Sequence, residues 1–141
     1  MSLVKPSLQT RYHVDFEWWR KNENDWHVHL TGLLCPEHAE MFANLLAGEL
    51  VDFVDPETAE VRPMDGVQHI ILTHCALQPE FVTGQTALVE AVLRTFLANG
   101  NTPLTSQELA DRLGRPANTI LITLSGARVY KGIRPMLEST P

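Results

Sequence analysis

Residues 103–135, PLTSQELADRLGRPANTILITLSGARVYKGIRP, form the stretch of sequence that decides the fold. A helix is predicted near its start, because the hydroxyl of Thr105 or Ser106 can cap a first turn and Glu108 stands where a capping-box carboxylate belongs. An apolar stripe at helical spacing follows, made of Leu109, Ala110 and Leu113. Gly114 is predicted to end this helix, since glycine adopts the left-handed cap conformation without steric cost.

A second helix and a short hairpin are predicted from the rest of this stretch. Pro116 suits the first turn of a helix, where its missing amide hydrogen has no partner in any case. The inner face of this helix comprises Ile120, Leu121 and Leu124, and Gly126 is predicted to close it. Two short strands, residues 128–130 and 133–136, are then expected to pair across a two-residue turn at residues 131–132.

Helix, glycine turn, helix and hairpin in this order resemble the winged helix-turn-helix family, over residues 86–136 when the preceding helix is included. The resemblance implies a three-helix core with a β-wing and, in most members, DNA binding through the second helix of the motif. It thus implies a DNA-binding transcriptional regulator or accessory protein without catalytic activity. The candidate nucleic-acid contacts are Arg115, Asn118, Thr119 and Thr123 on the second helix and Arg128, Lys131 and Arg134 on the wing.

A non-catalytic protein-interaction module is the competing interpretation of the same segment. Recognition helices usually present Arg, Lys, Asn or Gln to base edges. The predicted second helix is poor in these residues and directs Ile122 toward solvent or a partner. DNA binding predicts one positive patch that joins the cationic residues of helix and wing, whereas docking on protein predicts an exposed apolar patch around Ile122.

Composition and charge describe a globular protein with an uneven charge distribution. Of the 141 residues, 44% are hydrophobic and 20% are charged, and the net charge is −6. Residues 1–104 hold 6 Lys and Arg against 14 Asp and Glu, a charge of −8, whereas residues 105–141 hold 5 against 3, a charge of +2. This distribution argues against indiscriminate nucleic-acid binding and leaves room for local contact by the positive end.

The expected location is the cytoplasm. No apolar run approaches the ~20 residues of a membrane span, and the sequence shows no leader of the secretory type. A chain with two cysteines and no export signal is expected in a reducing compartment, where thiols are more often buried or metal-bound than bridged. No membrane partner is expected.

The predicted fold class is α+β, with a small N-terminal α+β part over residues 1–80 and a winged helix-turn-helix over residues 81–141. The break at residues 78–80, Gln-Pro-Glu, is the predicted linker. The N-terminal elements expected from periodicity are a hairpin of strands 12–18 and 26–30, a helix from Pro36 to about residue 47, a hairpin of strands 50–54 and 59–62, and a helix over residues 67–75. A strand over residues 68–73 is the alternative to the last helix, because this run is rich in β-branched residues.

The helix predicted over residues 86–98 is apolar around most of its circumference. Only Glu90, Arg94 and Thr95 are clearly polar within it. A helix of this kind is covered on more than one side. We therefore expect either a homodimer or a tight intrachain interface on the side opposite Glu90, where Val89, Leu93 and Leu97 lie.

Cys35, His38, His74 and Cys75 are the candidate metal ligands. Zinc needs about four thiolate or imidazole ligands, usually supplied as two close pairs that the fold brings together. The first pair has favourable spacing, with Cys35 at a predicted helix start and His38 one turn later. Neighbouring helical residues point ~100° apart, so His74 and Cys75 can both bind only if their helix has ended. The alternative ligands are His69, His27 and His29, the last two predicted on the solvent face of a strand.

Two other interpretations of these residues are open. The cysteines can be small buried packing residues, with the histidines at the surface. Alternatively, Cys35 can be the nucleophile of a cysteine-dependent enzyme assisted by a histidine, which predicts a deep pocket that holds Cys35. No phosphate-binding loop or paired-carboxylate motif accompanies the cysteine.

Overall fold

Strand β1 (Arg11–Val14) lies at the centre of an antiparallel sheet that joins the start of the chain to its end. It pairs with β4 (Leu104–Thr105) on one side and with β5 (Ile133–Pro135) on the other. The computed structural model describes residues 6–41, 50–55 and 58–136. The remaining elements are α1 (Phe16–Asn22), α2 (Trp26–Thr31), α3 (Pro36–Met41), β2 (Leu50–Val54), β3 (Val61–Asp65), α4 (Gly66–Thr73), the 3-10 turn η1 (Cys75–Leu77), α5 (Leu88–Ala98), α6 (Ser106–Leu113) and α7 (Ala117–Leu124).

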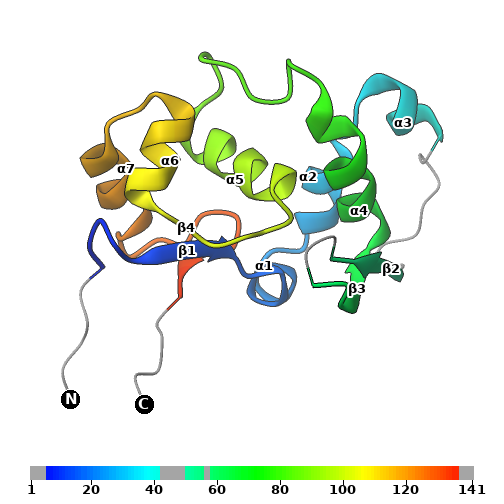
Figure 1. Ribbon diagram of the computed structural model, residues 1–141, viewed down its shortest axis with the longest axis horizontal. Coiled ribbons are helices and arrows are strands. Elements are labelled where there is room, and N and C mark those ends of the chain that lie inside the picture. The colour runs from blue at the N-terminus through cyan, green and yellow to red at the C-terminus, as the bar shows by residue number, and fades with distance from the viewer. Residues whose placement is uncertain (1–5, 42–49, 56–57, 137–141) are drawn as a thin grey trace.

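Helix α5 is the central helix of the molecule. In Figure 1 it lies between α6 and α7 at one end and α3, α4 and the β2–β3 hairpin at the other. Leu93 is fully buried and Leu97 is 2% exposed, while Val89 is partly buried against the same core. The intrachain interface expected for this apolar helix is therefore confirmed. The expected placement opposite Glu90 is wrong, because spacings of three and seven residues put Leu93 and Leu97 on the same side of the helix as Glu90. With 11 residues α5 is too short for a bilayer, and no other described helix has the length and apolar character of a membrane span.

The α6–α7 pair forms as its local sequence predicts. The hydroxyl of Thr105 accepts a hydrogen bond from the Glu108 amide at 3.1 Å, and the Glu108 carboxylate accepts one from the Thr105 amide at 2.9 Å. This capping box holds the start of α6. Gly114 ends the helix with φ of 66°, and Pro116 precedes the first residue of α7. Each of these signals acts within a few residues, so the sequence suffices to predict them.

The N-terminal hairpin predicted from alternating residues is wrong. After β1 the chain turns into α1, because the Asp15 carboxylate accepts a hydrogen bond from the Trp18 amide and caps a helix. Trp19 is fully buried in this helix, and its indole N–H donates to Glu23 at 2.8 Å. The apolar–polar alternation that predicted a strand as far as residue 18 is thus outweighed by the helix cap at Asp15 and by the burial of the Trp19 indole.

Residues 26–30 were expected to form the second strand of that hairpin and instead form most of α2. Leu30 is fully buried, whereas Val28 is 72% exposed. The side chains of His27 and His29 are only 12% and 27% exposed, so the prediction that they line a solvent face is also wrong. Trp26 packs against Trp19 with ring centroids 6.4 Å apart, and this contact between aromatic side chains fixes the helix on α1.

The other predicted hairpin and its helix are confirmed. Strands β2 and β3 pair in antiparallel register, with Leu50 opposite Asp65. The return strand lies at residues 61–65, later than the expected 59–62, because Ala59 adopts a positive φ of 60° in the turn. Asp65 then caps α4 through hydrogen bonds from the Val67 and Gln68 amides. The helix predicted from Pro36 is present as α3, and its expected continuation over residues 42–47 lies outside the described residues.

The predicted wing is present only in part. Lys131 and Gly132 both have positive φ, 52° and 74°, as a two-residue hairpin turn requires. The expected pairing of residues 128–130 with 133–136 is wrong, because it is reduced to a single bridge between Tyr130 and Ile133. The residues after the turn form β5 and pair with β1 instead. The resemblance to a winged helix therefore stays a prediction.

One hydrophobic core includes residues from both predicted parts of the chain. Tyr12 and Trp19 from the first part are fully buried in the same cluster as Phe96, Leu109 and Ile120 from the second. Contacts of β1 with β4 and β5 add a sheet that also spans the two parts. A substitution that introduces strain or removes packing in either part is therefore expected to destabilise the common core.

Asn101 connects the loop after α5 to the end of β1. Its side-chain oxygen accepts from the Val14 amide at 2.9 Å, and its side-chain nitrogen donates to the Val14 carbonyl at 2.8 Å. Val14 is 1% exposed, so water cannot readily replace these bonds. The backbone of Asn101 has a φ of 62°, a conformation that Asn tolerates better than most residues.

Replacing Asn101 by glycine is expected to lower the free energy of unfolding by about 2 kcal/mol, because a buried amide and carbonyl lose their partners while the positive φ is retained. Urea unfolding followed by circular dichroism measures the change. Asn99→Gly is the matched control, since its side chain bonds only to Thr102 at the exposed end of α5. Equal stability of the two variants would contradict the assigned role.

Candidate metal centre

The first pair of candidate ligands lies at the start of α3. Cys35 directly precedes Pro36, the first helical residue, and its carbonyl accepts the first helical hydrogen bond from Ala39 at 2.8 Å. His38 follows three residues after Cys35, so both side chains lie on one side of the first turn. Cys35 Sγ and His38 Nδ1 are 3.1 Å apart.

The second pair lies where α4 ends. The last helical residue is Thr73, and His74 leaves the helical conformation with φ of −138° and ψ of −61°. Cys75 then begins the turn η1. His74 and Cys75 can both bind one metal ion only if their helix has ended before them. This requirement is met, because they are not successive residues of one regular helix.

The two pairs converge on one point. Each of Cys35, His38, His74 and Cys75 offers one ligand atom, and these four atoms lie within 4.8 Å of one another. The sulfur atoms of Cys35 and Cys75 are 3.4 Å apart, and the rings of His38 and His74 have centroids 4.0 Å apart. Both cysteines are free thiols. Residues 40 positions apart in the sequence thus form one cluster of sulfur and nitrogen ligands.

The ligand set fits zinc in size and chemistry. With Zn–S of ~2.3 Å and Zn–N of ~2.0–2.1 Å, a tetrahedral site has S–S edges of roughly 3.8 Å and S–N edges of roughly 3.6 Å. The observed 3.4 Å and 3.1 Å are shorter by about half an ångström or less. Among the described residues, Nδ1 of His74 is buried without a hydrogen-bond partner. A cation in the cluster would satisfy such an atom.

Burial and the backbone amide of Cys35 act in opposite directions on the pKa of the Cys75 thiol. Burial raises the pKa of Cys75, because it disfavours the charged thiolate. The backbone amide of Cys35 donates to Cys75 Sγ at 3.3 Å and lowers that pKa. The larger effect is burial. A bound divalent cation would reverse the balance in favour of the thiolate.

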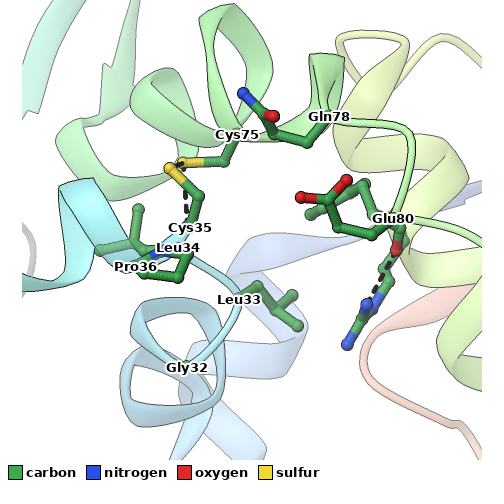
Figure 2. Close-up of a pocket in the computed structure, with 10 residues that line it drawn as sticks. Gly32, Leu33, Leu34, Cys35, Pro36, Cys75, Gln78 and Glu80 are labelled. Atoms are coloured by element: carbon green, nitrogen blue, oxygen red, sulfur yellow. Dashed lines mark hydrogen bonds between the residues drawn. The ribbon is translucent and has the colours of Figure 1, made fainter.

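A small cavity borders the cluster. It has a volume of about 190 Å³ and is lined by both cysteines, by Glu80 and by Arg94, among others. Figure 2 shows the two sulfur atoms side by side at one edge of this cavity, with Glu80 across from them. Cys35 thus lines a cavity, but the deep pocket that a cysteine-dependent enzyme predicts is not what this cavity offers, because it is smaller than the roughly 300–1,000 Å³ of typical ligand sites.

The alternative histidine ligands have other contacts. Nε2 of His29 lies 2.7 Å from the Glu90 carboxylate, and Nε2 of His27 lies 3.5 Å from Asp65. His69 faces the ring of Phe53 at a centroid distance of 6.2 Å. None of these three histidines belongs to the four-residue cluster. The sequence could not decide among them, because which histidine reaches the cysteines depends on how α2 and α4 pack.

A polar link between α2 and α5 was not predicted from the sequence. Glu90 accepts from His29 of α2 and lies 3.7 Å from Arg94 one turn later. Arg94 donates to the Phe81 carbonyl at 2.8 Å, and its guanidinium lies over the Phe81 ring. The spacing of Glu90 and Arg94 was a visible signal for an ion pair within the helix. The partner on α2 became apparent only with the tertiary structure.

The candidate nucleic-acid residues do not form one continuous set of available cations. Arg115 donates to the carbonyls of Gly84 and Thr86, and Arg134 pairs with Asp15 at 3.1 Å. Both cations therefore have contacts within the protein. The other candidates are Asn118, Thr119 and Arg128, which are exposed, and Thr123 and Lys131, which are half-buried. Ile122 on α7 is 73% exposed, as the docking alternative predicts.

Comparison with models of protein families, with curated proteins and with solved structures gives no match for this chain.

Proposed function

We propose that the protein binds one zinc ion through Cys35, His38, His74 and Cys75, and that this ion is structural. The observation that carries the proposal is the convergence of four ligand atoms within 4.8 Å from two separate segments. Two sulfur and two imidazole ligands suit zinc better than the oxygen-preferring Mg²⁺ or Ca²⁺. When bound, zinc would neutralise the negative charge of the two thiolates and would crosslink the start of α3 to the end of α4.

A complete set of protein ligands favours a structural role over a catalytic one. Catalytic zinc sites keep one coordination position for water or substrate, whereas structural sites use four protein ligands. The Cys35–His38 contact of 3.1 Å would also suit a nucleophilic cysteine and its base. Two further ligand residues at the same point are unnecessary for such an enzyme, and they are what a closed metal site requires.

Metal content of the purified full chain tests the proposal. One zinc per chain is expected by elemental analysis after removal of loosely bound metal on a desalting column. His69→Asn should leave this content unchanged, because His69 contacts Phe53 and lies outside the cluster. Protein that is folded, free of metal and unable to take up added zinc would overturn the proposal.

We propose DNA binding through α7 and the turn at residues 131–132 as a second function. It is supported by the exposed Asn118 and Thr119 in the first turn of α7, where recognition helices contact bases. Arg128, four residues after the end of α7, is exposed, and its guanidinium lies 5.0 Å from the centre of the Tyr130 ring. The exposed Ile122 supports the competing proposal that α7 docks on a protein partner.

A salt titration of duplex DNA binding separates these two proposals. The variant Arg128→Gln/Lys131→Asn should weaken binding and reduce the slope of log K against log salt by about 2, one for each lost phosphate contact. Asn is chosen at Lys131 because it tolerates the positive φ there. Lys21→Gln, in an exposed ion pair with Glu17, is the control. If the wild-type chain binds no duplex DNA at low salt, the DNA proposal fails.

A further inference from the structure

We infer that Cys35 and Cys75 are an oxidative modification site, at which a hydroperoxide forms an intramolecular disulfide and expels the metal. The regulatory part of this inference rests on the proposed zinc site. The covalent part rests on the two thiols alone. They are the only cysteines of the chain, so an internal disulfide has one possible pairing.

The two sulfur atoms are already in contact. Their separation of 3.4 Å must shrink by only about 1.4 Å to reach the ~2.05 Å of a disulfide bond. The backbone amide of Cys35 also donates to Cys75 Sγ at 3.3 Å and holds this sulfur against the α3 start. Because 39 residues separate the two cysteines along the chain, the fold and not local sequence creates this proximity.

A small oxidant can reach the pair. Both cysteines line the cavity of about 190 Å³, and Figure 2 shows their sulfur atoms at its edge. A water molecule occupies roughly 30 Å³ of liquid, so the cavity has room for a peroxide a little larger than water. Cys35 is half-buried and Cys75 is buried, which makes Cys35 the residue that meets the oxidant first.

The reaction balances with hydrogen peroxide as the oxidant. In the metal-free chain, His38 Nδ1, 3.1 Å from Cys35 Sγ, can accept the thiol proton in the tautomer that carries its own proton on Nε2. The Cys35 thiolate attacks one peroxide oxygen and the O–O bond breaks. The departing hydroxide takes the proton back from His38 and leaves as water, and a sulfenic acid forms. In the zinc-loaded chain Cys35 would already be a thiolate, and solvent would supply the proton for the leaving hydroxide. The Cys75 sulfur then attacks the Cys35 sulfur and the S–O bond breaks. The second hydroxide takes the Cys75 thiol proton and leaves as water. The cysteines lose two electrons, and the peroxide gains them.

Disulfide formation and metal binding exclude each other. Zinc binds thiolates, and both sulfur atoms of the cluster are consumed in the disulfide. His38 and His74 alone would remain, which is half of a closed structural site. Reduction by a dithiol restores the two thiols and hence the complete ligand set. The state of the Cys35–Cys75 pair would thus decide whether the clamp between α3 and α4 is a metal ion or a covalent bond.

The test treats the full chain with equimolar hydrogen peroxide, once zinc-loaded and once stripped with a chelator. Intact mass, free thiols and zinc released to a chromogenic chelator are followed. In both preparations we expect a mass decrease of two hydrogen atoms and loss of both thiols. The loaded protein should also release one zinc per chain, and dithiothreitol should reverse all changes. Cys35→Ser should form no internal disulfide, and His69→Asn should behave as wild type.

The outcomes distinguish this inference from the zinc proposal. In one outcome the chain binds zinc but forms no internal disulfide, and both thiols are unmodified or oxidised only to sulfinic acids. This outcome overturns the modification site and supports the zinc site. Disulfides that join two chains on a non-reducing gel overturn it equally. If the chain forms the internal disulfide but never takes up zinc, the modification site is supported and the zinc proposal is contradicted.

Discussion

Replacing Cys35 by serine is expected to abolish stoichiometric zinc binding and to remove the stability that the metal provides. A ligand that binds only the folded chain stabilises it by about 4 kcal/mol when its free concentration is a thousandfold above Kd. The effect should be large in this chain, because the ion would join α3 to the end of α4 and α4 packs on the central helix α5. Thermal unfolding with zinc and with a chelator measures the contribution.

The zinc dependence, not the absolute stability, is the informative quantity. Wild-type protein should lose thermal stability when the chelator is added, whereas Cys35→Ser should unfold at the same temperature in both conditions. His38→Asn, which removes a ligand that is only half-buried, should behave like Cys35→Ser. His69→Asn should keep the full response to the chelator. A chelator response in Cys35→Ser equal to that of wild type would show that the ion binds elsewhere.

Gly132→Ala is expected to lower the free energy of unfolding by about 3 kcal/mol, the largest effect predicted for a single added methyl group. Gly132 has a φ of 74°, which alone costs an alanine about 1–2 kcal/mol. A Cβ at this position would also lie 2.8 Å from the Asp15 carbonyl oxygen and 2.9 Å from Trp19 Cβ. Neither neighbour can move easily, because Asp15 is bonded to the turn and Trp19 is fully buried.

Gly114→Ala is the matched control for this prediction. Gly114 has a similar φ of 66°, but a Cβ there would meet no atom within 4 Å. The substitution is therefore expected to cost only about 1 kcal/mol, the strain of the left-handed conformation. Urea unfolding of both variants under one set of conditions gives the difference. If the two variants lose equal stability, the close packing of the turn against α1 is not what requires glycine at residue 132.

The sequence by itself determined the elements whose signals are local. The capping box of Thr105 and Glu108, together with Gly114, defines α6 because each contact joins residues at most four positions apart. The Cys35–His38 pair was visible for the same reason, since a spacing of three places both side chains on one turn. Because α5 is apolar around most of its circumference, the sequence also predicted that this helix packs against other elements, without identifying those elements.

Only the tertiary structure decided what depends on distant residues. Alternation over residues 12–18 and 26–30 suited a strand in both segments. Burial of Trp19 against Trp26 selected helices for residues 16–18 and 26–30, while residues 12–14 form part of β1. The end of α4 at Thr73 let His74 and Cys75 turn together toward α3, which completes the candidate metal centre. The periodicity of apolar residues and the spacing of ligands are properties of residues close together in the sequence. The position of β1 between β4 and β5 instead depends on packing between residues that are far apart in the sequence.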